Sequence, residues 1–111
     1  MSPVTTHILD TSRGKPAVGI GVILSRQQRE WTEMARGITN ADGRISDLLP
    51  TETVLPSGIY KLRFETGAYF SGLDIPAFYP FVEIVFQLTT GEHYHVPLLL
   101  NPFGYSTYRG S

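Results

Sequence analysis

A chain of 111 residues is long enough for one compact domain with its own core, and we expect a single domain over residues 1–111. Nine basic and ten acidic residues are interspersed and give a formal charge of −1, so no basic stripe is present that would bind a nucleic-acid backbone. The chain has no cysteine, which excludes disulfides, thiolate metal sites and a thiol nucleophile.

No apolar run approaches the roughly 20 residues that a helix needs to cross a bilayer. Residues 1–7 lack the charged and apolar regions of a secretory signal, and residues 109–111 do not match the usual C-terminal peroxisomal address. We therefore expect a soluble cytoplasmic protein, with the peroxisome left open for a eukaryotic source.

The first predicted strand covers Val4 to Asp10, where His7 shares one face with Thr5 and Leu9. Turn residues at 11–16 end it. A lone histidine near a chain end is usually solvated or structural, so the local sequence by itself does not favour a catalytic role for His7.

A second strand is predicted at 18–25 from the alternation of apolar residues. The residues on its apolar face are Val18, Ile20, Val22 and Leu24. A polar turn at 27–30 leads into a strand over 31–38, and we expect the two strands to pair. Trp31 is expected in the core or at an interface, because large aromatic side chains usually contribute buried area.

Residues 39–44 have the composition of a turn, with Asp42 and Gly43 at its tip. Arg44 follows directly. An arginine after a turn is usually solvated, so the local sequence assigns it no function. Residues 48–56 are expected to form an irregular connection.

The next strand, at 58–65, shows the clearest alternation and indicates a sheet with one wet face. Its inward residues are Tyr60, Leu62 and Phe64. A short helix is predicted at 66–73, with Thr66 as its N-cap and Gly72 as its stop.

Two more strands are predicted at 81–90 and 93–100, and we expect them to form a hairpin. In the second of them one face is apolar and the other carries imidazoles. The apolar face has Tyr94, Val96, Leu98 and Leu100, and the other has His93, His95 and Leu99. Asn101-Pro102 stops this strand, and a short aromatic strand leads to the last residues.

Seven or eight short strands at spacings of about ten residues, with one short helix, predict an all-β fold. The expected architecture is a two-sheet antiparallel β-sandwich. No internal repeat, low-complexity tract or linker interrupts it.

Four segments of the chain resemble the 5-hydroxyisourate hydrolases, the enzymatic branch of the transthyretin-like family. They are Thr5 to Ala17, Asn40 to Arg44, His95 to Leu100 and Tyr105 to Ser111, the last of which ends in the Tyr-Arg-Gly-Ser signature of that branch. The resemblance extends over nearly the whole chain. It implies a transthyretin-like sandwich assembled as a homotetramer, with the site in a channel between subunits.

The resemblance also implies a reaction, the hydrolysis of 5-hydroxyisourate to 2-oxo-4-hydroxy-4-carboxy-5-ureidoimidazoline in urate degradation, without a cofactor. Imidazoles near neutral pH can take a proton from water and return it to a leaving nitrogen, and guanidinium groups fit a flat anion. The implied catalytic residues are His7, His95 and Ser111. The implied substrate-binding residues are Arg44, Tyr108 and Arg109, and the two last would close the site together with Ser111.

Some assignments stay open at this point. Either histidine could take the first proton. Asp10 could orient a site group or make hydrogen bonds within its own turn. His93 is expected to be exposed and outside the site, because the matching family position is not a fixed active-site residue.

Three alternatives to the enzyme are weighed. A transthyretin-type carrier of thyroid hormones would share the fold, but transthyretin lacks the hydrolase histidine and arginine set and the Tyr-Arg-Gly-Ser end. A metal site formed by His93, His95 and His7 has only weak support in their spacing. A purely structural module explains the alternation but not the matching segments. No metal, no nucleic acid and no membrane partner is expected.

Overall fold

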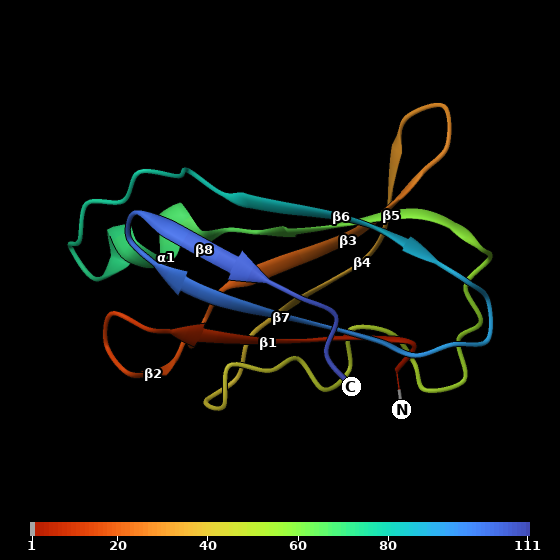
Figure 1. The fold of residues 1–111 in the computed structure, drawn as a ribbon, viewed down its shortest axis with the longest axis horizontal. Helices are drawn as coiled ribbons and strands as arrows, with labels where there is room; N and C mark the ends of the chain where they lie inside the picture. The colour runs from red at the N-terminus through yellow and green to blue at the C-terminus, as the bar shows by residue number, and fades with distance from the viewer. Residues whose placement is uncertain (1) are drawn as a thin grey trace.

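Two four-stranded sheets lie face to face in the computed structural model, which describes residues 2–111 (Figure 1). The first sheet has the strand order β2-β1-β7-β8, and the second β4-β3-β5-β6. The first is formed by β1 (Val4–Asp10), β2 (Lys15–Pro16), β7 (Tyr94–Asn101) and β8 (Gly104–Thr107). The second is formed by β3 (Gly21–Gln27), β4 (Trp31–Ile38), β5 (Gly58–Phe64) and β6 (Val82–Leu88). The predicted two-sheet sandwich is confirmed.

Neighbouring strands are antiparallel with one exception, the pair β1 and β7, which is parallel. Its register runs without a break from Val4 opposite Tyr94 to Asp10 opposite Leu100. The start of the chain and its last long strand are thereby joined over seven residue pairs. This pairing places Thr5 beside His95.

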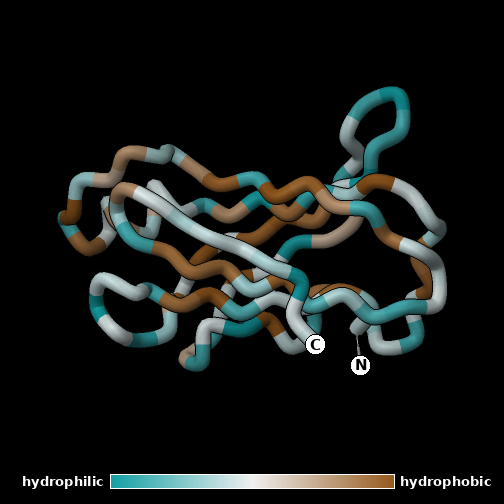
Figure 2. Tube along the Cα trace, in the orientation of Figure 1, coloured by the Kyte–Doolittle hydropathy of each residue, from teal (hydrophilic) through white to brown (hydrophobic). Residues whose placement is uncertain are grey.

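The core lies between the sheets and is filled by alternate residues of the strands. The buried side chains of β1 and β7 include Val4, Ile8, Val96, Leu98 and Leu100, and those of β5 are Tyr60, Leu62 and Phe64. Figure 2 shows hydrophobic stretches along the strands of both layers, whereas the loop between β3 and β4 is hydrophilic. The predicted inward faces of β5 and β7 are therefore confirmed.

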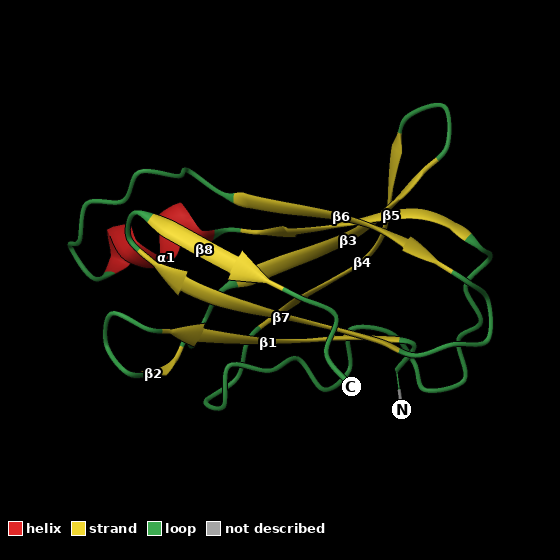
Figure 3. Ribbon diagram, viewed as in Figure 1, coloured by secondary structure: helices red, strands yellow, loops and turns green. Residues whose placement is uncertain are grey.

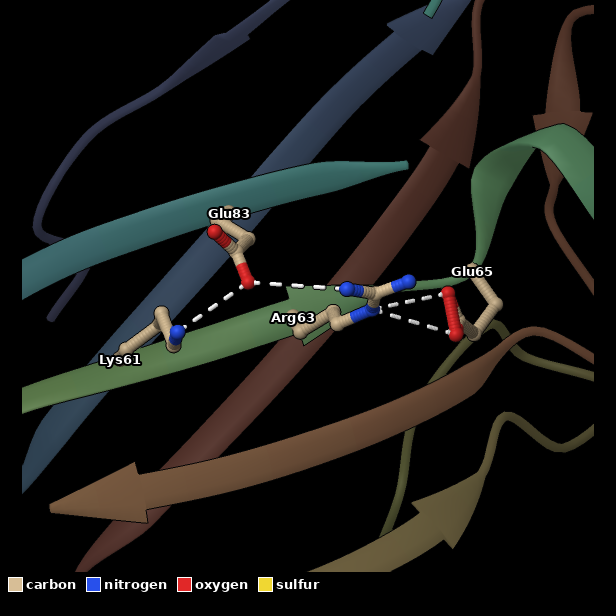
Figure 4. A network of polar contacts seen from close by, with 4 residues as sticks. All are labelled: Lys61, Arg63, Glu65 and Glu83. Carbon is tan, nitrogen blue, oxygen red and sulfur yellow. Dashed lines mark hydrogen bonds and ion pairs between the residues drawn. The ribbon is translucent and has the colours of Figure 1, made fainter. Parts of the chain in front are cut away.

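The outer face of the second sheet is wet, as the alternation in β5 predicts. Lys61 and Arg63 of β5 pair with Glu83 of β6, at 3.2 and 3.8 Å, and Arg63 pairs with Glu65 at 3.0 Å (Figure 4). Cross-strand pairs of this kind favour the observed register of β5 and β6, but partly exposed ion pairs add little to stability.

Two expectations about the β3–β4 hairpin need correction. Val18 is 53% exposed and outside the strand, because Gly19 has a φ of 81° and turns the chain before β3 begins. Trp31 lies on the outer face of the sheet with 37% of its surface exposed, beneath the Lys61 ammonium at 4.4 Å from the ring centroid. Within the protomer it is therefore not a core residue.

The expected hairpin of β6 and β7 is wrong. β6 pairs with β5 in the second sheet, while β7 pairs with β1 and β8 in the first, so the turn between them crosses from one sheet to the other. Both strands present an apolar face to the interior, where Phe86 and Tyr94 have ring centroids 6.2 Å apart. The side chains of β6 and β7 therefore meet across the core, but the two strands do not pair through backbone hydrogen bonds.

Helix α1 (Thr66–Gly72) lies at one end of the sandwich (Figure 3). The predicted N-cap is wrong: Glu65 holds that position without a side-chain cap, and the Thr66 hydroxyl is buried without a hydrogen-bond partner. The helix is held instead by tertiary contacts, including burial of Phe70 in the core. No helix among residues 2–111 is both long and apolar enough to span a bilayer.

Because the core residues are closely packed, Val22→Ala should lower the free energy of unfolding by about 2 kcal/mol, the transfer cost of two methyl groups with a small cavity term. Val22 is 1% exposed. Urea unfolding at fixed protein concentration measures the effect. The control is Val54→Ala, which removes the same atoms from a side chain that is 73% exposed and should change stability by less than about 0.5 kcal/mol. Equal losses in both variants would contradict the assigned core.

Candidate active site

A tight turn brings Arg44 to the outer face of β1. The Asn40 side-chain oxygen accepts hydrogen bonds from the amides of Asp42, at 2.9 Å, and Arg44, at 3.1 Å, which closes the turn. The Ile8 amide donates to the Gly43 carbonyl at 2.8 Å, and His7 and Arg44 form an antiparallel bridge. The predicted turn at 39–44 is confirmed, and it docks directly on the strand that carries His7.

Gly43 is required for this docking. Its φ of 73° lies in the left-handed region, and a Cβ atom at this position would lie 2.4 Å from the Ile8 carbonyl oxygen. A side chain would therefore push the turn away from β1 and separate Arg44 from His7.

The C-terminal segment lies beside His95 along the edge of β7 that does not pair with β1. The Gly110 amide donates to the His95 carbonyl at 2.8 Å, and the two residues form a second isolated bridge. A Cβ on Gly110 would lie 2.7 Å from His95 Cδ2, so glycine permits the close contact. Ser111 follows Gly110 directly in the sequence.

The outer face of the first sheet thus carries a cluster of His7, Arg44 and His95, which we call the imidazole cluster. Burial lowers the pKa of His95 below its ordinary value, and the charges of Arg44, His7 and His93 lower it further. Burial also lowers the pKa of His7, followed by the charge of Arg44, and these effects outweigh the opposing influence of Asp42. Both imidazoles are therefore neutral at pH 7 and able to accept a proton.

Tyr108 and Arg109 are not brought to this cluster within the protomer. The Arg109 guanidinium lies over the Tyr94 ring, at 4.2 Å from its centroid, and donates to the Glu92 carboxylate and the His93 carbonyl at 3.3 Å each. Tyr108 is 58% exposed, and both residues line a groove between β6, β7 and β8. Tyr94 and His95 are consecutive residues and face opposite sides of β7. Because the Arg109 guanidinium contacts the Tyr94 ring, it lies on the side of β7 opposite the His95 imidazole.

His93 and Thr5 are the residues that sequence reasoning missed. The expectation that His93 is exposed is wrong: it is partly buried, its Nδ1 lies 2.7 Å from the Ser2 carbonyl oxygen, and its Nε2 lies 3.2 Å from Thr5 Oγ1. Thr5 Oγ1 also lies 2.8 Å from His95 Nδ1. The parallel pairing of β1 with β7 creates these contacts, and no local signal in either segment indicates it.

Asp10 makes hydrogen bonds within its own turn, one of the two roles left open by the sequence. It is fully buried and accepts from the Ser12 hydroxyl at 2.6 Å, the Arg13 amide at 3.2 Å and the Tyr69 hydroxyl at 2.7 Å. Burial alone would raise the pKa of Asp10, but these donors outweigh it and hold the pKa below its ordinary value. The carboxylate points to the core side of β1, away from His7.

The metal-site alternative gains no support from the arrangement of possible ligands. In the described range, residues 2–111, no group of three or more His, Cys, Asp or Glu side chains is placed to hold a metal ion. His93 and His95 are instead both within hydrogen-bond distance of Thr5 Oγ1, and Arg44 acts on His7 and His95 as a nearby charge.

Comparison with known proteins identifies the family. The model of the HIUase/Transthyretin family matches residues 4–110. This chain belongs to the HIUase/Transthyretin family. Among the relatives, a probable 5-hydroxyisourate hydrolase from Schizosaccharomyces pombe is 46% identical over an alignment of 112 positions, which covers 97% of this chain and 90% of that protein.

Solved structures from both branches of the HIUase/Transthyretin family share the fold. The structure of Klebsiella pneumoniae 5-hydroxyisourate hydrolase matches with a TM-score of 0.87 and 43% identity, covering 99% of this chain and all of that one. The crystal structure of sea bream transthyretin in complex with thyroxine matches with a TM-score of 0.91 and 33% identity, covering 97% and 94%. The backbone does not separate the branches, whereas sequence identity is higher to the hydrolases.

The electrostatics of the imidazole cluster can be tested directly. Arg44→Gln removes the positive charge that opposes protonation of both histidines, so the pKa values of His7 and His95 should both rise toward the ordinary imidazole value of 6.5. Titration followed by NMR of the histidine rings measures them. The matched control is Arg29→Gln in the loop between β3 and β4, which projects away from the sandwich (Figure 1) and should leave both pKa values unchanged. Unshifted values in Arg44→Gln would contradict the cluster.

Proposed function

We propose that this protein hydrolyses 5-hydroxyisourate. The observation that carries the proposal is that His7, Arg44 and His95 meet on one face of the first sheet, although they come from segments far apart in the sequence. The chain is also 43 to 46% identical over nearly its whole length to proteins named as 5-hydroxyisourate hydrolases. The product is the ureidoimidazoline carboxylate, and the chemistry uses no cofactor.

In the proposed reaction, the two neutral imidazoles act as an acid/base pair. One of them takes a proton from a water molecule whose oxygen attacks the carbonyl carbon of the cyclic amide. When the C–N bond breaks, a proton returns from the imidazolium to the leaving nitrogen, and the ring opens to a carboxylic acid that releases its proton to water. Lowered pKa values keep His7 and His95 ready to accept the first proton at neutral pH.

Arg44 is the proposed substrate-binding cation. Its planar guanidinium fits a flat, oxygen-rich anion, and its charge stabilises the oxygen on which negative charge develops. Ser111 is proposed as a catalytic residue, and the bridge between His95 and the preceding Gly110 supports this proposal. For Tyr108 and Arg109, contact with the substrate stays a prediction. Within the protomer, Arg109 fixes the segment that carries Ser111.

We further propose that the single domain, residues 1–111, assembles as a homotetramer with the site at a subunit interface. The imidazole cluster lies on the outer face of its sheet with half-buried histidines, so a neighbouring protomer would remove it from water. Assembly would also cover the exposed edge strands β6 and β8. A cytoplasmic location stays a prediction.

The second candidate is a transthyretin-type carrier, because the sea bream transthyretin with bound thyroxine matches this backbone with a TM-score of 0.91. A carrier needs a channel of suitable shape but no proton acceptors, whereas the imidazole cluster provides two. Thyroxine binding without any effect on 5-hydroxyisourate would favour the carrier.

The enzyme should accelerate the decay of 5-hydroxyisourate, generated from urate by urate oxidase, over the spontaneous rate. His95→Ala should lower kcat/KM by about 100-fold or more, because it removes a general acid/base group. Size-exclusion chromatography and circular dichroism should show an unchanged assembly and fold. Unchanged decay with folded wild-type protein would overturn the enzyme, and full activity in His95→Ala would remove His95 from the mechanism.

Arg44→Gln should raise KM and lower kcat, because the guanidinium binds both the substrate anion and the developing oxyanion. The same steady-state assay measures both constants. Arg29→Gln serves as the control for loss of one positive charge and should retain both values. A kinetic profile of Arg44→Gln that matches the control would show that Arg44 does not contact the substrate.

A further inference from the structure

Four polar groups form a continuous hydrogen-bonded chain along the β1–β7 pair. The Ser2 carbonyl oxygen lies 2.7 Å from His93 Nδ1, and His93 Nε2 lies 3.2 Å from Thr5 Oγ1. The same Thr5 oxygen lies 2.8 Å from His95 Nδ1. One end of the chain is a fixed backbone group, and the other end is a proposed catalytic imidazole.

For a neutral His93, the direction of every bond in this chain follows from its fixed end. A carbonyl oxygen only accepts, so His93 Nδ1 must carry a proton and donate it. In a neutral imidazole the other nitrogen is then an acceptor, and the Thr5 hydroxyl donates its single proton to His93 Nε2. The Thr5 oxygen is left to accept, so the proton of neutral His95 lies on Nδ1.

We propose that Thr5, with His93 behind it, is a positioning residue that sets the tautomer of His95. The chain keeps the proton on Nδ1 and leaves the Nε2 lone pair free as the base. The inference rests on the proposed function, because it specifies which nitrogen of His95 takes the proton from water. Neither Thr5 nor His93 is among the active-site residues that the family resemblance implies.

The orientation of the ring agrees with this assignment. Nδ1 faces Thr5, and the opposite edge of the ring, at Cδ2, faces Gly110. Nε2 is bonded to Cδ2, so it lies on the side of the terminal segment that carries Ser111, away from the hydrogen-bonded chain. The nitrogen that the chain leaves unprotonated is therefore next to the ring edge that faces the terminal segment.

The chain also fixes the position of the ring. A threonine hydroxyl on β1 holds a side chain on β7, and the parallel register places the two residues directly side by side. Because β1 and β7 are ordered by the core on their inner faces, the bond acts between two rigid elements. A tautomer that is set in this way costs no reorganisation when the substrate arrives.

The test combines kinetics with a direct measurement of the tautomer at pH 8, where an imidazole of ordinary pKa, about 6.5, is neutral. In the wild-type protein, the ¹⁵N NMR shifts of His95 should show a protonated Nδ1 and an unprotonated Nε2. Thr5→Val keeps the shape and removes the hydroxyl, so His95 should move toward the other tautomer and kcat should fall about tenfold, with KM little changed.

Matched variants separate positioning from a general loss of structure. Thr5→Ser keeps the hydroxyl and should restore both the tautomer and kcat. Thr32→Val makes the same substitution on β4 in the other sheet and should have no effect. His93→Ala should act in the same direction as Thr5→Val, and the double variant should lose less than the sum of the two.

Two outcomes would overturn the positioning role. One is a wild-type His95 whose proton lies on Nε2, and the other is a Thr5→Val variant with unchanged tautomer and kcat. Failure of the proposed function looks different, because the wild-type protein would then show the Nδ1 proton without any acceleration of 5-hydroxyisourate decay. The NMR result on the wild-type protein remains decisive if the Thr5→Val variant does not fold.

Discussion

The parallel pairing of β1 with β7 is the interaction on which the rest of the structure depends. On its inner side the pairing joins Ile8 and Leu98 in the core, and on its outer side it sets Thr5 beside His95. Side chains alternate along both strands, so a slip by one residue would move the core residues to the outside and the imidazoles to the inside. The burial of the inner face therefore fixes the geometry of the outer face.

Two short segments complete this face, and each docks through a backbone hydrogen bond. The turn at 40–44 docks through the Gly43 carbonyl, and the terminal segment docks through the Gly110 amide. At each point a Cβ atom would lie closer than 3 Å to its neighbour. The side chains that carry the proposed chemistry, Arg44 and Ser111, each follow directly after one of these glycines, so their placement depends on close approach of the main chain.

The sequence predicts features that depend on a single strand, but it misses features that depend on which strands lie side by side. Alternation identified the inner faces of β5 and β7 because the period of a strand is set by its own backbone. It could not say which strand lies beside which, so β6 and β7 were expected to pair although each has a better partner in a different sheet. The same gap explains His93, whose hydrogen bonds come from residues some ninety positions earlier in the chain.

The residues of the candidate site were also only partly predictable from the local sequence. Nothing in the local sequence distinguishes Arg44 from a solvated arginine, and only the resemblance to a family singled it out. Tyr108 and Arg109 belong to the same signature as Ser111, yet within the protomer Arg109 faces Glu92 and Tyr94, on the other side of β7. A signature can therefore contain residues that hold the segment in place as well as residues proposed to act on the substrate, and the structure shows that Arg109 makes contacts of the first kind.

Since the backbone is shared with a thyroxine-binding transthyretin, the difference in function must lie in the side chains of the outer face. Arg44 gives this face a property that neither histidine has alone. Its charge lowers the pKa of both imidazoles while the site is empty, which keeps them unprotonated. An anionic substrate that pairs with Arg44 offsets this charge, so both imidazoles become stronger bases when the substrate is bound. In the proposed mechanism, Arg44 thus couples binding of the substrate to the strength of the base that the reaction needs.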